Sequence, residues 1–222
     1  MIEYEKICSS KNFNKSITAR RSNEEEREAD MNKIQILIKA GYAGFMIGIG
    51  GIVYLSVENK IIASLLFSFG LLTIVTQGFY LYTGKIGFIK KWNELLDMAV
   101  IIAGNFIGTF IAAWIANMAH LNISSAELVD KKLNNNISNI FLLSVLCGVM
   151  MYLAIDNFKK AKNILFIIAP VMIFILSGFE HSVANMFYFH LAGVYHLKSL
   201  GYLLIMLLGN GIGAKLFDLK SE

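Results

Sequence analysis

Long runs of apolar residues alternate with short polar stretches between residues 40 and 216. A helix needs about 20 mainly apolar residues to cross the hydrocarbon core of a membrane. The runs approach or exceed this length once a single charged residue is allowed near a helix end. We therefore predict an all-α protein with six transmembrane helices, over residues 34–57, 61–90, 93–119, 137–157, 163–190 and 198–217.

Composition indicates an integral membrane protein. Of the 222 residues, 56% are hydrophobic and 16% are charged, whereas about a quarter of the residues in a typical soluble domain are charged. The basic residues are scattered rather than gathered on one face, which argues against a nucleic-acid partner. Cys8 lies in a polar segment and Cys147 in an apolar run, so they predict free thiols rather than a disulfide framework or a metal site. No cofactor is expected.

The first 33 residues are polar and mixed in charge. They predict a solvated cytoplasmic tail that leads into a helix. Ser22 and Glu25 have the spacing of a capping box, so the helix is expected to begin near Ser22. A plug or gate formed by the tail is the alternative.

The basic residues near the span ends predict the orientation in the membrane. Six spans place both chain ends on one side. That side also carries Lys90, Lys91, Lys159, Lys160, Lys162, Lys215 and Lys220, whereas the other side has Lys60, Lys131, Lys132 and Lys198. Cytoplasmic loops carry an excess of Lys and Arg. Both termini are therefore predicted to be cytoplasmic, with the protein in the inner (plasma) membrane.

An internal repeat divides the membrane part into two halves. The predicted third span carries GNFIG at Gly104–Gly108, and the sixth carries GNGIG at Gly209–Gly213. Repeats of three spans have opposite topology in the membrane. Glycines four residues apart favour close helix packing, and the asparagines are expected to bond neighbouring backbone or helices. The predicted organisation is a tail and helix start (1–33), a first three-helix repeat (34–119), an extracellular connection (120–136), a second three-helix repeat (137–217) and a cytoplasmic C-terminus (218–222).

Polar residues and glycines interrupt the predicted second and fifth spans. The second contains Gly78 and the stretch Leu81–Gly87, and the fifth contains Gly178 beside Glu180 and His181. Non-helical backbone at membrane depth is tolerated only inside protein or along a cavity. In inverted repeats, the corresponding broken helices meet near the midplane of the membrane. These two interruptions therefore predict a polar site at the centre of the chain.

Glu180 and His181 are expected to have different roles. Ionisable residues at membrane depth usually mark a pathway for ions or protons, but successive helical residues point about 100° apart and cannot both face one pore. We assign His181 to the pore, where it could exchange a proton with an anion that loses its hydration, and Glu180 to the scaffold behind it. A purely structural, hydrogen-bonded histidine is the alternative.

The same residues resemble the formate/nitrite transporter family. Gly178–Met186 (GFEHSVANM) is similar to a signature of that family, and Leu81–Gly84 (LYTG) is similar to its loop in the second helix. The glycines within Ala43–Gly51 and the two Gly-Asn motifs also match. The resemblance extends from about Lys39 to Leu216.

The resemblance implies an aquaporin-like fold of six helices, a homopentamer, and one pore per protomer for small monovalent anions. It implies His181 at the pore centre between two hydrophobic constrictions, a hydrogen bond near it from Thr83, and a link between Lys132 and Glu180. It also makes the N-terminal segment a proposed gate. Leu71, Leu81, Tyr82 and Phe174 are expected to narrow the pore. Thr83, Asn185 and the N-termini of the broken helices are expected to donate hydrogen bonds to the anion.

One position departs from the family pattern, and one stretch indicates a branch within the family. The family usually has Asn after the Leu-Cys pair of the fourth span, where this chain has Gly148, so Glu180 is expected to have one partner fewer. The stretch Thr83–Gly87 (TGKIG) is more similar to the hydrosulfide-channel branch than to the formate branch. Hydrosulfide is therefore the predicted substrate, with formate or nitrite as the alternative.

We therefore predict a non-enzymatic channel in the lipid bilayer that conducts a small monovalent anion and exchanges protons with it at His181. An intramembrane metalloenzyme would need a spacing such as His-Glu-x-x-His, which the sequence lacks. The Asn-Pro-Ala pair of water channels is also missing, and the only proline is Pro170. A structural or sensor membrane protein without a conducting pore remains the alternative from another class.

Overall fold

The computed structural model describes residues 32–91 and 94–218, which are mainly helical and contain no β-strand. The helix start predicted near Ser22 and most of the predicted tail lie outside these residues. In chain order the helices are a first helix over Asn32–Ser56, α2 (Lys60–Thr76), α3 (Tyr82–Lys85), the short 3₁₀ helix η1 (Ile86–Phe88), α4 (Glu94–Met118), α5 (Ala126–Leu133), α6 (Ile137–Ala161), α7 (Leu165–Leu176), α8 (Ser182–Leu191) and α9 (Leu197–Asp218).

Four of the described helices are long and apolar enough to cross a membrane, namely Asn32–Ser56, α4, α6 and α9, and α2 and α7 are shorter apolar helices. Large apolar side chains point outward from them. Leu96 on α4, Phe69 on α2 and Leu208 on α9 are 70%, 63% and 63% exposed. Extensive exposed apolar surface is characteristic of contact with lipid rather than water. The chain is a multi-pass membrane protein, as its composition predicts.

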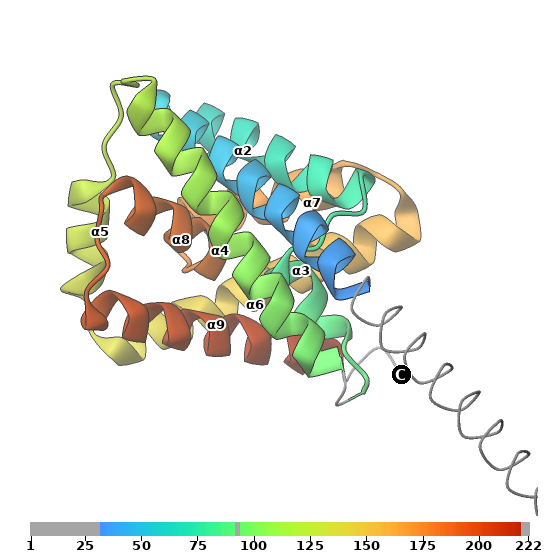
Figure 1. The fold of residues 1–222 in the computed structure, drawn as a ribbon. Helices are drawn as coiled ribbons and strands as arrows, with labels where there is room; N and C mark the ends of the chain where they lie inside the picture. Colours follow the sequence, from blue (N-terminus) through green and yellow to red (C-terminus); the bar gives the residue numbers. More distant parts are fainter. Residues whose placement is uncertain (1–31, 92–93, 219–222) are drawn as a thin grey trace, which may run out of the picture.

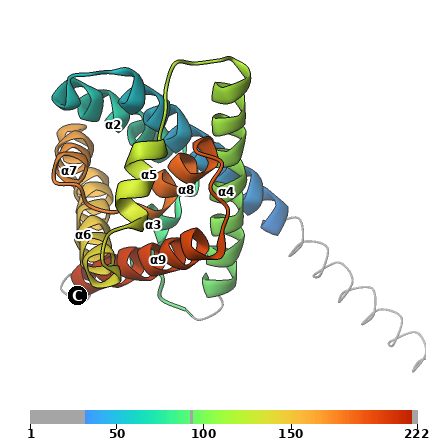
Figure 2. The ribbon, with the colours of Figure 1, turned by 90° about the vertical axis from the view of Figure 1, so that its left-hand side faces the viewer.

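The longer helices surround the short helices α3 and α8 (Figures 1 and 2). Every residue of α8 from Ser182 to His190 is buried. The connection predicted over 120–136 contains a helix, α5, which lies in front of α8 in Figure 2. The Ser125 hydroxyl just before α5 donates to the carbonyl oxygen of Tyr188 on α8, at 2.7 Å. The connection is therefore packed against the interior helices.

The chain leaves the helical conformation in the same way at two places 100 residues apart. Residues 77–81 separate α2 from α3, and residues 177–181 separate α7 from α8. At each break a glycine takes a left-handed backbone conformation, with φ of 66° at Gly78 and 69° at Gly178. The N–H of the following residue, Phe79 or Phe179, then donates a hydrogen bond of 2.9 Å to the carbonyl oxygen five residues earlier in the chain. This is the common glycine-dependent helix end, and it explains why a glycine stands at both positions.

Two buried asparagines hold the backbone at these breaks. Asn105 on α4 accepts a hydrogen bond from the N–H of Tyr82, at 2.9 Å, and its amide donates to the carbonyl oxygens of Ala40 and Tyr80, at 2.8 and 2.9 Å. Asn210 on α9 makes the equivalent three bonds in the other half, to the Ser182 N–H and to the carbonyl oxygens of Ser144 and Glu180, each at 2.8 Å. The predicted bonding of both asparagines to neighbouring backbone is confirmed.

Gly148 has a steric role that the departure from the family pattern does not reveal. A Cβ atom at Gly148 would lie 2.1 Å from the carbonyl oxygen of Asn210. Gly44 has the same relation to Asn105 in the other half, at 2.2 Å. Both glycines therefore let a neighbouring helix approach closely enough for its asparagine to reach the break.

We expect Gly148→Ala to lower the free energy of unfolding by about 1–3 kcal/mol, because the added methyl group would push α6 away from α9. The melting midpoint of the purified protein in detergent measures the effect. Gly201→Ala on α9 is the matched control, since a Cβ atom there would meet no atom of another described segment within 4 Å. Equal midpoints for the two variants would contradict the steric role.

Candidate functional site

His181 and Thr83 meet where the two interrupted helices face each other. His181 is the residue before α8, and Thr83 lies in α3. The Thr83 Oγ1 and His181 Nε2 atoms are 2.9 Å apart, and the two residues are 1% and 2% exposed. A buried polar pair thus joins the two predicted repeats.

The hydrogen bonds of the imidazole define its protonation. The His181 Nδ1 atom accepts the backbone N–H of Ala184, at 3.1 Å. Because that N–H can only donate, Nδ1 carries no proton here, and a neutral ring has its proton on Nε2. Nε2 then donates to Thr83 Oγ1, which leaves the hydroxyl hydrogen of Thr83 for another acceptor. A second proton on the imidazole would have to break the bond from Ala184.

Most of the other donors expected to serve an anion already have acceptors. Asn185 donates both of its amide hydrogens, to the Glu180 carboxylate at 2.8 Å and to the His181 carbonyl oxygen at 3.0 Å. The first N–H groups of α3 and α8 donate to the two asparagines described above. Of the expected side-chain donors, the Thr83 hydroxyl is therefore the one with a hydrogen to offer in this conformation.

Apolar side chains surround the polar pair. The Phe174 ring stacks on the His181 imidazole, with ring centroids 5.5 Å apart. The rings of Phe67 and Phe174 form a T-shaped pair, with their centroids 6.2 Å apart. Leu71 and Leu81 are both 1% exposed and belong to the same buried cluster as Phe174. A solute that reaches Thr83 would leave most of its hydration behind.

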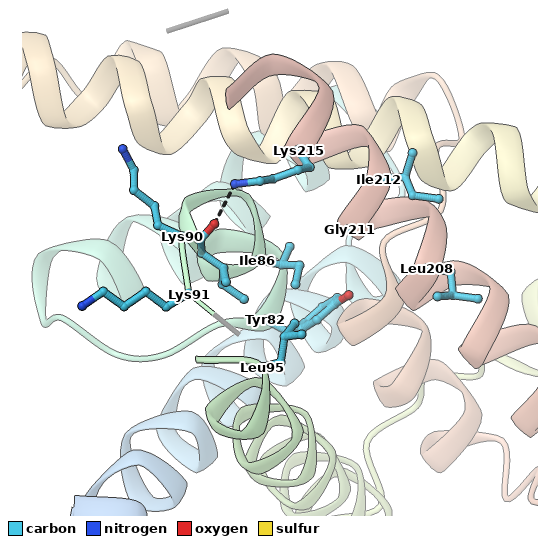
Figure 3. A pocket seen from close by; sticks show the side chains of 10 residues that line it. Tyr82, Ile86, Lys90, Lys91, Leu95, Leu208, Gly211, Ile212 and Lys215 are labelled. Atoms are coloured by element: carbon cyan, nitrogen blue, oxygen red, sulfur yellow. Dashed lines mark hydrogen bonds between the residues drawn. The ribbon is translucent and has the colours of Figure 1, made fainter. Parts of the chain in front are cut away.

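Tyr82 is directed away from this pair. Its hydroxyl donates to the carbonyl oxygen of Leu207 on α9, at 2.9 Å. Its ring lines a separate pocket between α3 and α9 that also contains Ile86 and Leu208 (Figure 3). All four residues expected to narrow a pore belong to the buried cluster, but Leu71, Leu81 and Phe174 do not line this pocket.

Glu180 lies behind His181 with its own partners. Its Oε2 atom is 2.5 Å from the Lys132 ammonium, and the two side chains are 4% and 13% exposed. α5 supplies Lys132, and the packing of α5 on α8 brings it to the carboxylate. The contact that the family resemblance implies is present. Asn185 adds an amide donor to Glu180, so the carboxylate has two partners although Gly148 offers no side chain.

Two side-chain oxygens near Glu180 have no hydrogen-bond partner among residues 32–91 and 94–218. They are Ser182 Oγ and Asn185 Oδ1, both buried at the start of α8. Buried polar atoms in native proteins normally have a partner. These atoms can therefore accept a hydrogen bond from a small protic molecule beside the Glu180 and Asn185 pair.

A cavity of about 140 Å³ lies next to the break between α2 and α3. Leu81 and Gly84, the neighbours of Thr83, form part of its wall, and Lys85 and Lys159 also line it. Both lysines are exposed. Two positively charged side chains thus stand at the wall of this cavity.

The sequence does not reveal the position of His190. Its place near a predicted span end suggests an interfacial residue, but it is 4% exposed, packs on Phe106 of α4 and bonds to the Tyr195 hydroxyl. Its partners come from another helix and from the following loop, so no local pattern could identify them. Within the described ranges there is no group of three or more His, Cys, Asp or Glu that could hold a metal ion.

The model of the formate/nitrite transporter family matches residues 15–219. The chain belongs to this family. It is 28% identical over 149 residues to the formate channel FocA of Haemophilus influenzae, an alignment that spans 58% of this chain and only about half, 52%, of that protein. It is 23% identical to the formate channel FocB of Escherichia coli K12, over 79% of this chain and 74% of the relative. It is also 23% identical to the formate-nitrite transporter of Plasmodium falciparum, over 84% and 76%.

Solved structures share the fold. A structure described as an FNT family ion channel has a TM-score of 0.77 and 23% identity, covering 86% of this chain and 90% of that one. A pentameric formate channel with formate bound has the same TM-score and identity, covering 85% and 95%. The predicted family is confirmed. The relatives are named for formate or nitrite, so they favour the formate or nitrite alternative over the predicted hydrosulfide.

Lys132→Met should destabilise the protein, because it leaves the buried Glu180 carboxylate without its cation. Breaking a buried pair from one side costs about 3–5 kcal/mol. The melting midpoint in detergent should fall for Lys132→Met and recover in large part when Glu180→Gln is added. Lys131→Met, at the exposed neighbouring position of α5, is the control and should melt as the unchanged protein does. A midpoint for Lys132→Met equal to that of Lys131→Met would contradict a stabilising pair.

Proposed function

We propose that the protein is a channel for the small monovalent anions of weak acids, with formate or nitrite as its substrate. The observation that carries the proposal is the buried Thr83–His181 pair between the two helix breaks. Membership of the formate/nitrite transporter family supports it, as do the names of three relatives and one solved structure, which all include formate. Because Thr83 Oγ1 accepts from His181, its hydroxyl hydrogen remains available, and it can bind one small acceptor at a time.

The proposed architecture counts each broken pair as one membrane span. α2 with α3, and α7 with α8, then join the four long helices to give six spans in two inverted repeats. The proposed assembly is a homopentamer in the inner membrane with both termini in the cytoplasm. The pentameric formate channel of similar fold supports the assembly, and the distribution of lysines supports the orientation.

In the proposed mechanism, an anion approaches through the lysine-lined cavity beside Leu81. Lys85 and Lys159 raise its local concentration there. Passage between the buried apolar side chains then removes water, which strongly disfavours the bare charge. The Thr83 hydroxyl replaces part of the lost hydration, and its bond from His181 Nε2 strengthens it as a donor. Glu180 and Lys132 hold the segment from behind.

His181 serves first as a hydrogen-bond donor in this mechanism. A neutral imidazole with its proton on Nε2 would have to become an imidazolate to give that proton up, which makes it a poor acid. Proton exchange therefore requires Nδ1 to be protonated first, and the Ala184 N–H bond must open for this. Proton exchange is thereby linked to a movement of the ring at the start of α8.

Hydrosulfide is the second candidate substrate. The specific observation in its favour is the stretch Thr83–Gly87, which includes Lys85 at the cavity wall. Hydrosulfide is also a small monovalent anion of a weak acid and would meet the same donor.

Proteoliposomes test the proposed function directly. We expect formate and nitrite to cross vesicles that contain the protein faster than empty vesicles, with chloride, which is not the anion of a weak acid, as the comparison ion. Hydrosulfide is measured in the same assay, and each ion is measured over a range of pH. If no ion moves faster than through empty vesicles, the channel proposal fails and a structural or sensor protein is the better description.

His181→Phe should change formate flux or its dependence on pH, because the variant keeps an aromatic ring against Phe174 but cannot donate to Thr83. His120→Asn is the control: it removes an exposed imidazole at a left-handed backbone position that asparagine tolerates. Unaltered flux and an unaltered pH profile in His181→Phe would remove His181 from the mechanism.

A further inference from the structure

A pocket of about 580 Å³ lies outside the proposed pathway, between α3, η1, the start of α4 and the end of α9. It is larger than the cavity beside Leu81 and falls within the usual size of small-molecule sites. It opens on the outer face of the described chain, as Leu95 and Leu208 in its wall are 43% and 63% exposed. Neither Thr83 nor His181 lines it.

The pocket has a charged end and an apolar end. Three lysines are among its ten lining residues and no acidic residue is. In Figure 3, Lys90 and Lys91 extend to one side of Tyr82, whereas Leu208 and Ile212 lie on its other side. A pocket of this kind suits a ligand that has an anionic group at one end and an apolar group at the other.

Two acidic residues lie close to these lysines. The Lys215 ammonium contacts Asp218 at 2.5 Å and donates to the Ile89 carbonyl oxygen at 2.7 Å. Glu94 accepts the backbone N–H of Lys90 but lines a neighbouring pocket. Lys91 adds a further exposed positive charge.

The charged and apolar ends of the pocket are arranged in the same order as the polar surface and the hydrocarbon core of a membrane. Lys215 lies in the last turn of α9, and Leu208 lies seven residues before it on the same long apolar helix. Seven residues of helix extend roughly 10 Å, about a third of a hydrocarbon core of ~30 Å. The lysines are therefore at the membrane boundary, on the side predicted to be cytoplasmic, and the apolar end reaches into the depth of the acyl chains.

We propose that this pocket binds an anionic phospholipid of the adjoining leaflet. The phosphate group would lie between Lys90, Lys91 and Lys215, and the upper part of an acyl chain would lie along Leu208 and Ile212. Basic pockets between membrane helices on the cytoplasmic side bind anionic headgroups in this manner. The proposal does not depend on which anion the channel conducts. Because Tyr82 precedes Thr83, the lipid would contact the segment that carries the proposed donor.

Native mass spectrometry of the full chain in detergent tests the proposal without a flux measurement. We expect phosphatidylglycerol to bind at least fivefold more tightly than phosphatidylcholine with the same acyl chains. Soluble glycerol phosphate, which has the headgroup charge but no acyl chain, should bind at least fivefold more weakly than phosphatidylglycerol. Equal binding of the two lipids would overturn the proposal, and so would glycerol phosphate binding as tightly as phosphatidylglycerol.

Two variants locate the site. Lys90→Gln with Lys91→Gln should weaken phosphatidylglycerol binding at least fivefold relative to Lys131→Gln with Lys198→Gln, which removes the same charge from exposed positions away from the pocket. Ile212→Trp, which fills the apolar end, should weaken it relative to Leu204→Trp, at an exposed position on the same helix that does not line the pocket. The masses in the same spectra show whether each variant keeps its assembly. If Ile212→Trp disrupts the assembly while phosphatidylglycerol binding per chain is unchanged, a second copy covers the pocket and the lipid proposal is overturned.

Discussion

The hydrogen bonds of two buried asparagines are the interaction on which the central structure depends. Backbone N–H and C=O groups that leave a helix inside a membrane have no water to bind, and an unpaired group costs several kcal/mol. Asn105 and Asn210 each provide one acceptor and two donors at a break. No smaller side chain offers this set, and the close approach of the neighbouring helix, permitted by Gly44 and Gly148, brings each amide within reach.

This bracing also determines what the site can offer a solute. Asn210 and His181 accept the N–H groups of Ser182 and Ala184, so only part of the positive end of α8 is open to an anion. Among the side chains that face the two breaks, the hydroxyl of Thr83 is then the main donor, within an apolar surrounding. A site with few and weak donors favours passage over tight binding, because strong coordination would hold the anion in place.

Much of the fold and part of the site could be predicted from the sequence. Apolar runs give the long helices, and the paired glycines with His181 indicate the breaks, because local periodicity carries both signals. The repeated Gly-Asn motif predicted the backbone bonding of both asparagines. The direction of Tyr82, the burial of His190 and the helix α5 depend on packing between segments far apart in the chain, which periodicity does not encode. The prediction of hydrosulfide as the substrate rested on a short stretch of sequence, and the names of the relatives instead favour formate or nitrite.

The placement of the asparagines has a consequence for biogenesis. Each asparagine lies on the helix made after the break that it braces: Asn105 follows the break at 77–81, and Asn210 follows that at 177–181. During synthesis the first break cannot be locked until α4 has been inserted, nor the second until α9 has. Until α4 and α9 are inserted, the backbone groups of the two breaks therefore need other hydrogen-bond partners, such as water or groups of the translocon. The Thr83–His181 contact is then among the last interactions to form, and a chain that loses α9 would lose the site together with its bracing.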